Sequence, residues 1–174
     1  MTHELRWELI WDGFKYLLTT LPLHLKKMGY ARELKNLRIR RQRCHTAWQP
    51  HLERTRSLIL ESAECCTQKN TVLIIGSGLL FDIPLAELSK RFREVILVDI
   101  LHLWQVHRII SSYSNVRLHR LDVTGIVKEV HAITSSSMPL KVPDFKPQFF
   151  LSDRVDLVAS VNIVSQLPVL PNGY

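Results

Sequence analysis

The pattern of apolar and polar positions changes partway along the chain. In the first part, apolar residues recur at helical spacing in 5–21 (LRWELIWDGFKYLLTTL) and again in 50–66 (PHLERTRSLILESAECC), where Pro50 lies near the start of the stretch. In the second part, short β-branched runs alternate with stretches of helical periodicity. We therefore expect a helical N-terminal segment, residues 1–66, followed by an α/β domain, residues 67–174.

Four apolar runs in the second part have the composition of strands in a parallel sheet. The first two, 71–76 (TVLIIG) and 94–100 (EVILVDI), contain few polar residues, as strands buried on both faces do. The third lies in 115–123 (NVRLHRLDV) and the fourth in 154–164 (RVDLVASVNIV). Amphipathic helical patterns separate the runs. The alternation predicts right-handed crossovers and a Rossmann-like α/β sheet of parallel strands.

The composition agrees with a folded domain. The 174 residues are 46% hydrophobic, yet no apolar run is long enough to cross a bilayer. The N-terminus carries acids where a secretory signal would be basic, and no small-residue cleavage site follows. The three cysteines, two of them adjacent, do not make a disulfide framework. We therefore expect a soluble, cytoplasmic protein without a transmembrane segment.

The net charge of +7 is partly concentrated in residues 32–43 (RELKNLRIRRQR), where six basic residues accompany one acid. Such a run can bind phosphates and so indicates a contact with RNA or anionic lipid. The alternative is a solvated helix face, with Leu34, Leu37 and the stem of Arg41 turned inward. No aromatic or glycine-rich nucleic-acid signature accompanies the charges, so the sequence favours the solvated helix.

Glycine or polar residues follow each of the four predicted strands. Gly76 and Gly78, after the first strand, allow a tight turn and a close approach of the backbone to a ligand. Asp99 ends the second strand, 21 residues beyond Gly78, where a carboxylate can accept hydrogen bonds from both ribose hydroxyls. The other such residues are Asp122 after the third strand, placed to face an adenine edge, and Ser160 and Asn162 after the fourth. Because open parallel sheets bind ligands beyond the carboxyl ends of their strands, these positions predict one shared site.

With these motifs the chain resembles the class I S-adenosylmethionine-dependent methyltransferases. The resemblance covers about residues 70–170 and rests on VLIIGSG, VILVDI, RLDV and VDLVASVNIVSQLP as the first to fourth motifs. The chain also looks like a bacterial branch of this fold that has a helical N-terminal extension. The resemblance implies S-adenosylmethionine as cofactor and a methyl acceptor that the sequence does not identify. The residues implied at the cofactor are Gly76, Ser77 and Gly78 beside its methionine portion, Asp99 with Ile100 at its ribose, Asp122 with Val123 at its adenine, and Ser160 near the acceptor.

Several positions depart from the expected motifs. Ile74 stands where the family usually has an acid, and Leu80 where its third glycine falls. Asp82 could compensate by facing the ammonium group of the cofactor, although capping of the next helix is the favoured role. Asp99 would suit NAD(P) equally well, but Phe81 occupies the third glycine position of the dinucleotide motif, where strand and helix pack closely. The first hypothesis is therefore a methyltransferase and the second an NAD(P)-binding protein. The third is a non-catalytic scaffold or binding protein that retains the methyltransferase fold.

Methyl transfer requires mainly that the acceptor be aligned with the methyl group, so no obligatory catalytic residue is expected. Asn162 either orients an acceptor amine or hydroxyl or satisfies local backbone groups, and the sequence favours neither. No metal site is expected. His102 and His107 are five residues apart and so point to different faces of a helix, and the adjacent cysteines lack a second ligand pair.

The predicted sheet stops after its fourth strand, whereas the fold of the family has seven. A strand left at the edge of a sheet is an aggregation hazard unless it is covered. We expect a fragment whose domain is incomplete at the C-terminus. Completion of the sheet by a partner chain or by self-association, and coverage of the edge by the N-terminal helices, are the alternatives.

Overall fold

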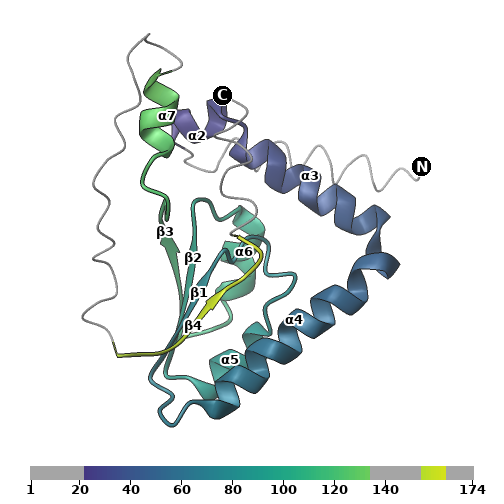
Figure 1. The fold of residues 1–174 in the computed structure, drawn as a ribbon, viewed down its shortest axis with the longest axis vertical. Helices are drawn as coiled ribbons and strands as arrows, with labels where there is room; N and C mark the ends of the chain where they lie inside the picture. Colours follow the sequence, from purple (N-terminus) through teal and green to yellow (C-terminus); the bar gives the residue numbers. More distant parts are fainter. Residues whose placement is uncertain (1–21, 134–153, 164–174) are drawn as a thin grey trace.

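The structure is a computed structural model, and it describes residues 22–133 and 154–163 (Figure 1). The predicted helix in 5–21 lies outside these residues. In chain order the elements are α2 (Leu23–Lys27), α3 (Tyr30–Arg43), α4 (His45–Cys65), β1 (Thr71–Ile75), α5 (Leu85–Arg91), β2 (Glu94–Asp99), α6 (Trp104–Ile110), β3 (Val116–Arg120), α7 (Val127–Ile133) and β4 (Val155–Ser160).

The strands form one all-parallel sheet in the order β3-β2-β1-β4. This confirms the expected α/β class, and the arrangement is compatible with a Rossmann-like fold. From β1 the chain proceeds outward through β2 to β3 and then returns to the other side of β1 as β4. The order in which strands are added to the sheet therefore reverses between β1 and β4, although all four strands run parallel. Open parallel sheets bind ligands at such a reversal point.

The two faces of the sheet are packed differently. On one face, buried residues such as Val72, Ile74 and Leu97 form a core with residues of α4, α5 and α6. On the other face, Leu73 and Ile96 belong to a smaller cluster that includes residues from the segment after β3. Successive side chains of a strand point to opposite faces, so a strand such as β1, which is apolar from Val72 to Ile75, supplies both cores.

The pairing of β1 with β4 contains a β-bulge. Thr71 pairs with Val155, but Val72 pairs with Leu157, so Asp156 is an extra residue in β4. Its Oδ2 accepts hydrogen bonds from the backbone N–H groups of Asn70, at 2.6 Å, and Thr71, at 3.0 Å. The carboxylate thus satisfies two donors at the beginning of β1. Bulges of this kind locally bend a strand and fix its register.

The helical part of the chain differs from expectation in one boundary. α4 begins at His45, so Pro50 is inside the helix rather than near its start. A proline removes one backbone hydrogen bond, and here that loss falls in the second turn of a long helix, where the following turns hold the helix together. Cys44 ends α3 and begins α4, so the two helices meet at a single residue and form a corner (Figure 1).

Two further expectations are met within the described part of the chain. No helix there combines the length and the apolar character that crossing a membrane would require. The three cysteines, Cys44, Cys65 and Cys66, are all free thiols.

Candidate functional site

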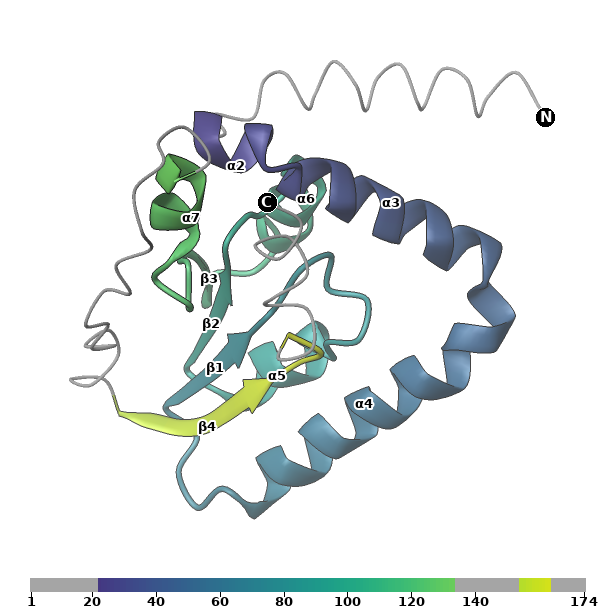
Figure 2. The ribbon, with the colours of Figure 1, turned by 45° about the horizontal axis from the view of Figure 1, so that its top comes forward.

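Helices α2 and α3 lie across the end of the sheet to which the strands point (Figure 2). Ala31, Leu34 and Leu37 of α3 pack against residues of the loops that follow β1 and β2, among them Leu79 and Leu101. Leu25 and Met28 pack against α7. The carboxyl ends of the strands, where the predicted site residues lie, are thus walled by the N-terminal helices.

Gly76 is a glycine because the segment after β4 approaches it closely. Its φ is 81°, in the left-handed region. A Cβ atom at this position would lie 2.7 Å from the carbonyl oxygen of Val161 and 2.8 Å from Cβ of Ile163. The residue therefore joins β1 to the exit of β4, and the space beside it is filled by protein.

Gly78 has the same kind of backbone but different surroundings. Its φ is 45°, and a Cβ atom would meet nothing nearer than Oδ2 of Asp99 at 3.9 Å and the carbonyl oxygen of Gly76 at 4.0 Å. The N–H of Gly78 donates to Oδ2 of Asp99 at 2.7 Å. The turn after β1 is thus tied to the carboxylate that ends β2, and a side chain at Gly78 would make only ordinary van der Waals contacts.

Asp99 is held in place by backbone donors. In addition to Gly78, the N–H of Leu101 donates to Oδ1 at 3.4 Å. Burial raises the pKa of the Asp99 carboxyl above its usual value, while the backbone hydrogen bonds from Gly78, Leu101 and Ile100 oppose that rise. A carboxylate has about four lone-pair sites, so it can accept further hydrogen bonds from a ligand.

Ser77 and His102 form a buried pair between the same two loops. The two side chains are 1% and 5% exposed, and Oγ of Ser77 lies 2.9 Å from Nε2 of His102. Burial is the main cause that lowers the pKa of His102 to about 4, so the ring is neutral at pH 7. The side chain of Ser77 therefore positions the turn, and its place beside the methionine portion of the cofactor stays a prediction. The sequence did not single out His102 for this role, although its place between Leu101 and Leu103 marks it as buried.

Asp82 does not cap a helix. α5 begins at Leu85 with Pro84 as its N-cap residue and without a side-chain hydrogen bond at the cap. The favoured prediction for Asp82 was therefore wrong, because the helix begins two residues later than a cap at Asp82 requires. Instead, Oδ2 of Asp82 accepts a hydrogen bond from Nδ2 of Asn162 at 2.6 Å. This pair bridges the loop after β1 and the exit of β4, across the reversal point of the sheet.

Leu80 and Phe81 occupy the places where glycines were expected. Leu80 has a φ of 62°, so the backbone keeps a left-handed conformation although the residue is a leucine. The guanidinium carbon of Arg41 lies 4.0 Å from the centroid of the Phe81 ring, and Arg56 donates to the Phe81 carbonyl oxygen. The loop is thus anchored to both α3 and α4, and the inward orientation predicted for Arg41 is confirmed.

Asp122 is engaged within its own turn. Its carboxylate accepts hydrogen bonds from N–H of Thr124 at 2.9 Å, from Oγ1 of Thr124 at 2.5 Å and from N–H of Val127 at 2.9 Å. These contacts cap the beginning of α7. Burial raises the pKa of Tyr30 to about 12, and the charge of Asp122 adds to the rise. Asp122 thus lies at the carboxyl end of the sheet, as predicted, but its carboxylate there holds the turn before α7.

Of the other predicted site residues, two pack in hydrophobic clusters and one is exposed. Ile100 packs against two of the hydrophobic clusters under α2 and α3, and Val123 packs on the sheet face that includes Leu73. Ser160 is the last residue of β4 and is exposed. The structure brings the remaining residues together as two pairs: Gly78 with Asp99 at the ends of β1 and β2, and Asp82 with Asn162 at the reversal point between β1 and β4.

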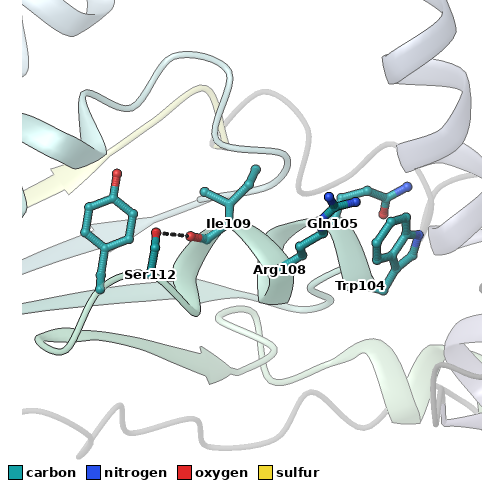
Figure 3. Close-up of a pocket in the computed structure, with 6 residues that line it drawn as sticks. Trp104, Gln105, Arg108, Ile109 and Ser112 are labelled. Carbon is teal, nitrogen blue, oxygen red and sulfur yellow. Dashed lines mark hydrogen bonds between the residues drawn. The ribbon is translucent and has the colours of Figure 1, made fainter.

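A shallow depression of about 500 Å³ lies on α6 and not at this edge (Figure 3). It is lined by Trp104, Gln105, Arg108, Ile109, Ser112 and Tyr113. Within it, Oγ of Ser112 donates to the carbonyl oxygen of Ile109, a contact of the helix end with itself. None of the predicted site residues lines this depression. Among the residues for which side chains are described, no group of three or more potential metal ligands occurs.

Comparisons with known proteins gave no match to a family model, to a curated protein or to a solved structure. The functional argument therefore depends on the geometry of this chain.

Proposed function

We propose that the protein is an S-adenosylmethionine-dependent methyltransferase whose cofactor binds at the carboxyl ends of β1 and β2. The observation that carries the proposal is the juxtaposition of Asp99 with the turn at Gly78. The carboxylate lies at the end of β2 and accepts a hydrogen bond from a glycine whose Cβ position would meet no atom closer than 3.9 Å. A ribose placed there would donate its two hydroxyls to Asp99.

The loop after β1 favours this cofactor over NAD(P). A dinucleotide needs a helix that begins directly after the glycines, so that the helix N-terminus can stabilise the pyrophosphate. Here six residues separate Gly78 from the beginning of α5, and α5 is only seven residues long. S-adenosylmethionine carries no phosphate and does not need such a helix. Within this loop the ring of Phe81 packs beneath Arg41 of α3.

When bound, S-adenosylmethionine would supply an electrophilic methyl group for transfer to a nucleophilic acceptor. The chain's part is to hold and orient the reactants. Asp99 would hold the ribose, and the turn at Gly78 would lie along the methionine portion. The Asp82–Asn162 pair would border the place where the acceptor enters, because it spans the loop after β1 and the exit of β4.

A non-catalytic binding protein is the second candidate, and two observations favour it. The carboxylate of Asp122 is used to cap α7, and the hydroxyl of Ser77 is used in the contact with His102. Both residues were expected at the cofactor. A protein that retains the sheet but has lost the chemistry would keep these structural contacts.

Calorimetry on the full chain separates these functions. We expect micromolar binding of S-adenosylmethionine and S-adenosylhomocysteine and no binding of NAD. Asp99→Asn keeps an oxygen for the N–H of Gly78 but removes the charge, and it should weaken binding by at least about tenfold, the loss typical of a charged hydrogen bond. Glu87→Gln, which removes an exposed acid from α5, is the matched control. Absence of binding by any of the three ligands to a folded chain would favour the non-catalytic protein.

A further inference from the structure

The outer side of α3 carries a row of cations. Arg32, Lys35, Arg40 and Arg43 are exposed. Positions 32, 35, 36, 39 and 43 follow the helical repeat and share one side of the helix, with Arg40 at its flank. We call Arg32, Lys35, Arg40 and Arg43 the α3 ridge. From Arg32 to Arg43 it is about 16 Å long, at about 1.5 Å per residue.

The ridge is fixed at the ligand edge of the sheet. The opposite side of α3 presents Leu34 and Leu37 to the loops after β1 and β2, and Arg41 to the ring of Phe81. These are the loops that hold Gly78 and Asp99. Whatever the ridge binds would therefore lie on the outer side of the same helix whose inner side packs on the loops of the proposed cofactor site.

Little of the charge on the ridge is neutralised by the protein. The only acid in α3 is Glu33, and it forms an ion pair with Arg40. For Arg32, Lys35 and Arg43 the structure gives no ion pair among the described residues. An exposed ion pair such as that of Arg40 contributes less than about 1 kcal/mol, so a phosphate can replace it.

The character of the helix favours nucleic acid over a membrane. A helix that binds a lipid surface inserts its apolar side into the bilayer. The apolar side of α3 is occupied by the protein, and the ridge side has only Ile39 as an exposed large hydrophobic residue. One strand of a double helix has a phosphate per about 3.4 Å, and a stacked single strand that keeps this spacing would place about five phosphates along the ridge.

We propose that the α3 ridge binds the backbone of single-stranded RNA and that the methyl acceptor is an unpaired nucleotide of that RNA. The second part rests on the proposed methyltransferase function. An unpaired nucleotide is required because α2 and α3 wall the carboxyl ends of the strands, and a base that remains stacked in a duplex does not reach past such a wall (Figure 2).

The test measures fluorescence anisotropy of a labelled 20-nucleotide polyuridine strand with the full chain, over a series of salt concentrations and without cofactor. The ridge variant replaces Arg32, Lys35, Arg40 and Arg43 with Gln. The control variant replaces four exposed cations on other parts of the molecule, Arg54, Lys90, Arg93 and Arg108, with Gln and so has the same net charge.

We expect the ridge variant to bind at least tenfold more weakly, and the control variant to bind within about twofold of the unmodified chain. Loss of four phosphate contacts should also make the slope of log affinity against log salt shallower by about 3. Equal losses in both variants would show that only net charge matters and would overturn the proposal. Absence of RNA binding by the unmodified chain, or a preference for phosphatidylserine vesicles or duplex DNA of the same length, would overturn it as well.

Two further variants separate this proposal from the methyltransferase function. Asp99→Asn should bind the RNA strand normally, and the ridge variant should bind S-adenosylhomocysteine normally in calorimetry. If the RNA binds but S-adenosylhomocysteine does not, the ridge stands as an RNA-binding surface and the acceptor assignment fails. If S-adenosylhomocysteine binds and the RNA does not, the ridge fails and the methyltransferase function stands.

Discussion

Gly76 and Gly78 have similar left-handed backbones, yet their surroundings give them different tasks. The Cβ position of Gly76 is occupied by the segment after β4, whereas that of Gly78 is open beside Asp99. The sequence shows two equivalent glycines. Only the folded chain shows that a side chain would be crowded at the first and not at the second.

This difference predicts unequal costs of substitution. Gly76→Ala should lower the free energy of unfolding by about 3 kcal/mol, because both the positive φ and the close contacts oppose a methyl group. Gly78→Ala should cost only about 1 kcal/mol, from its φ alone. Urea unfolding monitored by circular dichroism measures both values. Equal costs would show that the contact of Gly76 with Val161 and Ile163 does not hold in solution.

Burial of His102 predicts a pH-dependent stability. Its pKa is about 4 in the folded chain and about 6.5 when unfolded, so the unfolded chain binds the proton more readily between these values. Stability contributed by the neutral ring is fully present above pH 6.5 and is lost as the pH falls toward 4. Between pH 7 and pH 4.5 the unmodified chain should lose about 2 kcal/mol more than His102→Gln does, as measured by urea unfolding at each pH.

The matched control is His51→Gln, which changes an exposed histidine of α4. This variant should keep the pH dependence of the unmodified chain. If His102→Gln also keeps it, the ring of His102 is not buried as a neutral group, and its contact with Ser77 is not the one described.

The roles of single residues can be predicted from the sequence only where they do not depend on contacts with residues far along the chain. Asp99 was predicted from its spacing after Gly78, and the structure shows the two in contact. The pairing of Asp82 with Asn162 joins residues 80 positions apart, and no local pattern indicates it. Local reasoning instead assigned Asp82 to the nearest helix, because an acid before a helical pattern is usually a cap.

At the scale of elements, the hydrophobic pattern predicted the four strands within a few residues. β1 and β2 are almost wholly apolar and bounded by glycine or charged residues, so their limits are clear in the sequence. The beginnings of α4 and α5 were predicted less well. α4 begins after Cys44, which is not a usual cap residue. α5 begins after Pro84, whereas the cap residue that the sequence offers, Asp82, lies two residues earlier.

Asp122 provides a test of how α7 is held. Asp122→Ala removes hydrogen bonds to Thr124 and Val127, and it should destabilise α7 locally by about 1–2 kcal/mol, the usual loss for a helix cap. Hydrogen exchange should become faster in 124–133 and remain unchanged in β1 and β2. Lys128→Ala, an exposed change on the same helix, is the control. Unchanged exchange in 124–133 would mean that Asp122 is not a cap. It would then again be a candidate for binding the adenine of the cofactor.

At the scale of the whole molecule, the parallel α/β class followed from the alternation of patterns, but the position of the N-terminal helices did not. α3 could be read from its sequence as an amphipathic, basic helix. That it packs on the loops after β1 and β2 depends on the fit of Leu34 and Leu37 into a surface formed by residues far along the chain. This placement turns a basic helix into one wall of the candidate site.

β4 is the end strand of the described sheet, and Val158 in it is 56% exposed. The sequence predicted it as an apolar strand, the last of the parallel sheet. β4 is less buried than β1 and β2 because, among the described residues, only β1 is paired with it.

The central claim is that a nucleoside cofactor binds where β1 and β2 end. Its most direct test is a titration of the ¹⁵N-labelled full chain with S-adenosylhomocysteine, followed by amide chemical shifts. The account predicts that the largest shifts fall on residues 76–78 and 99–101, with smaller ones at 122–123, and that they are absent in Asp99→Asn. Shifts concentrated on the α6 depression, 104–113, or no shifts at millimolar ligand with a well-dispersed spectrum, would contradict it.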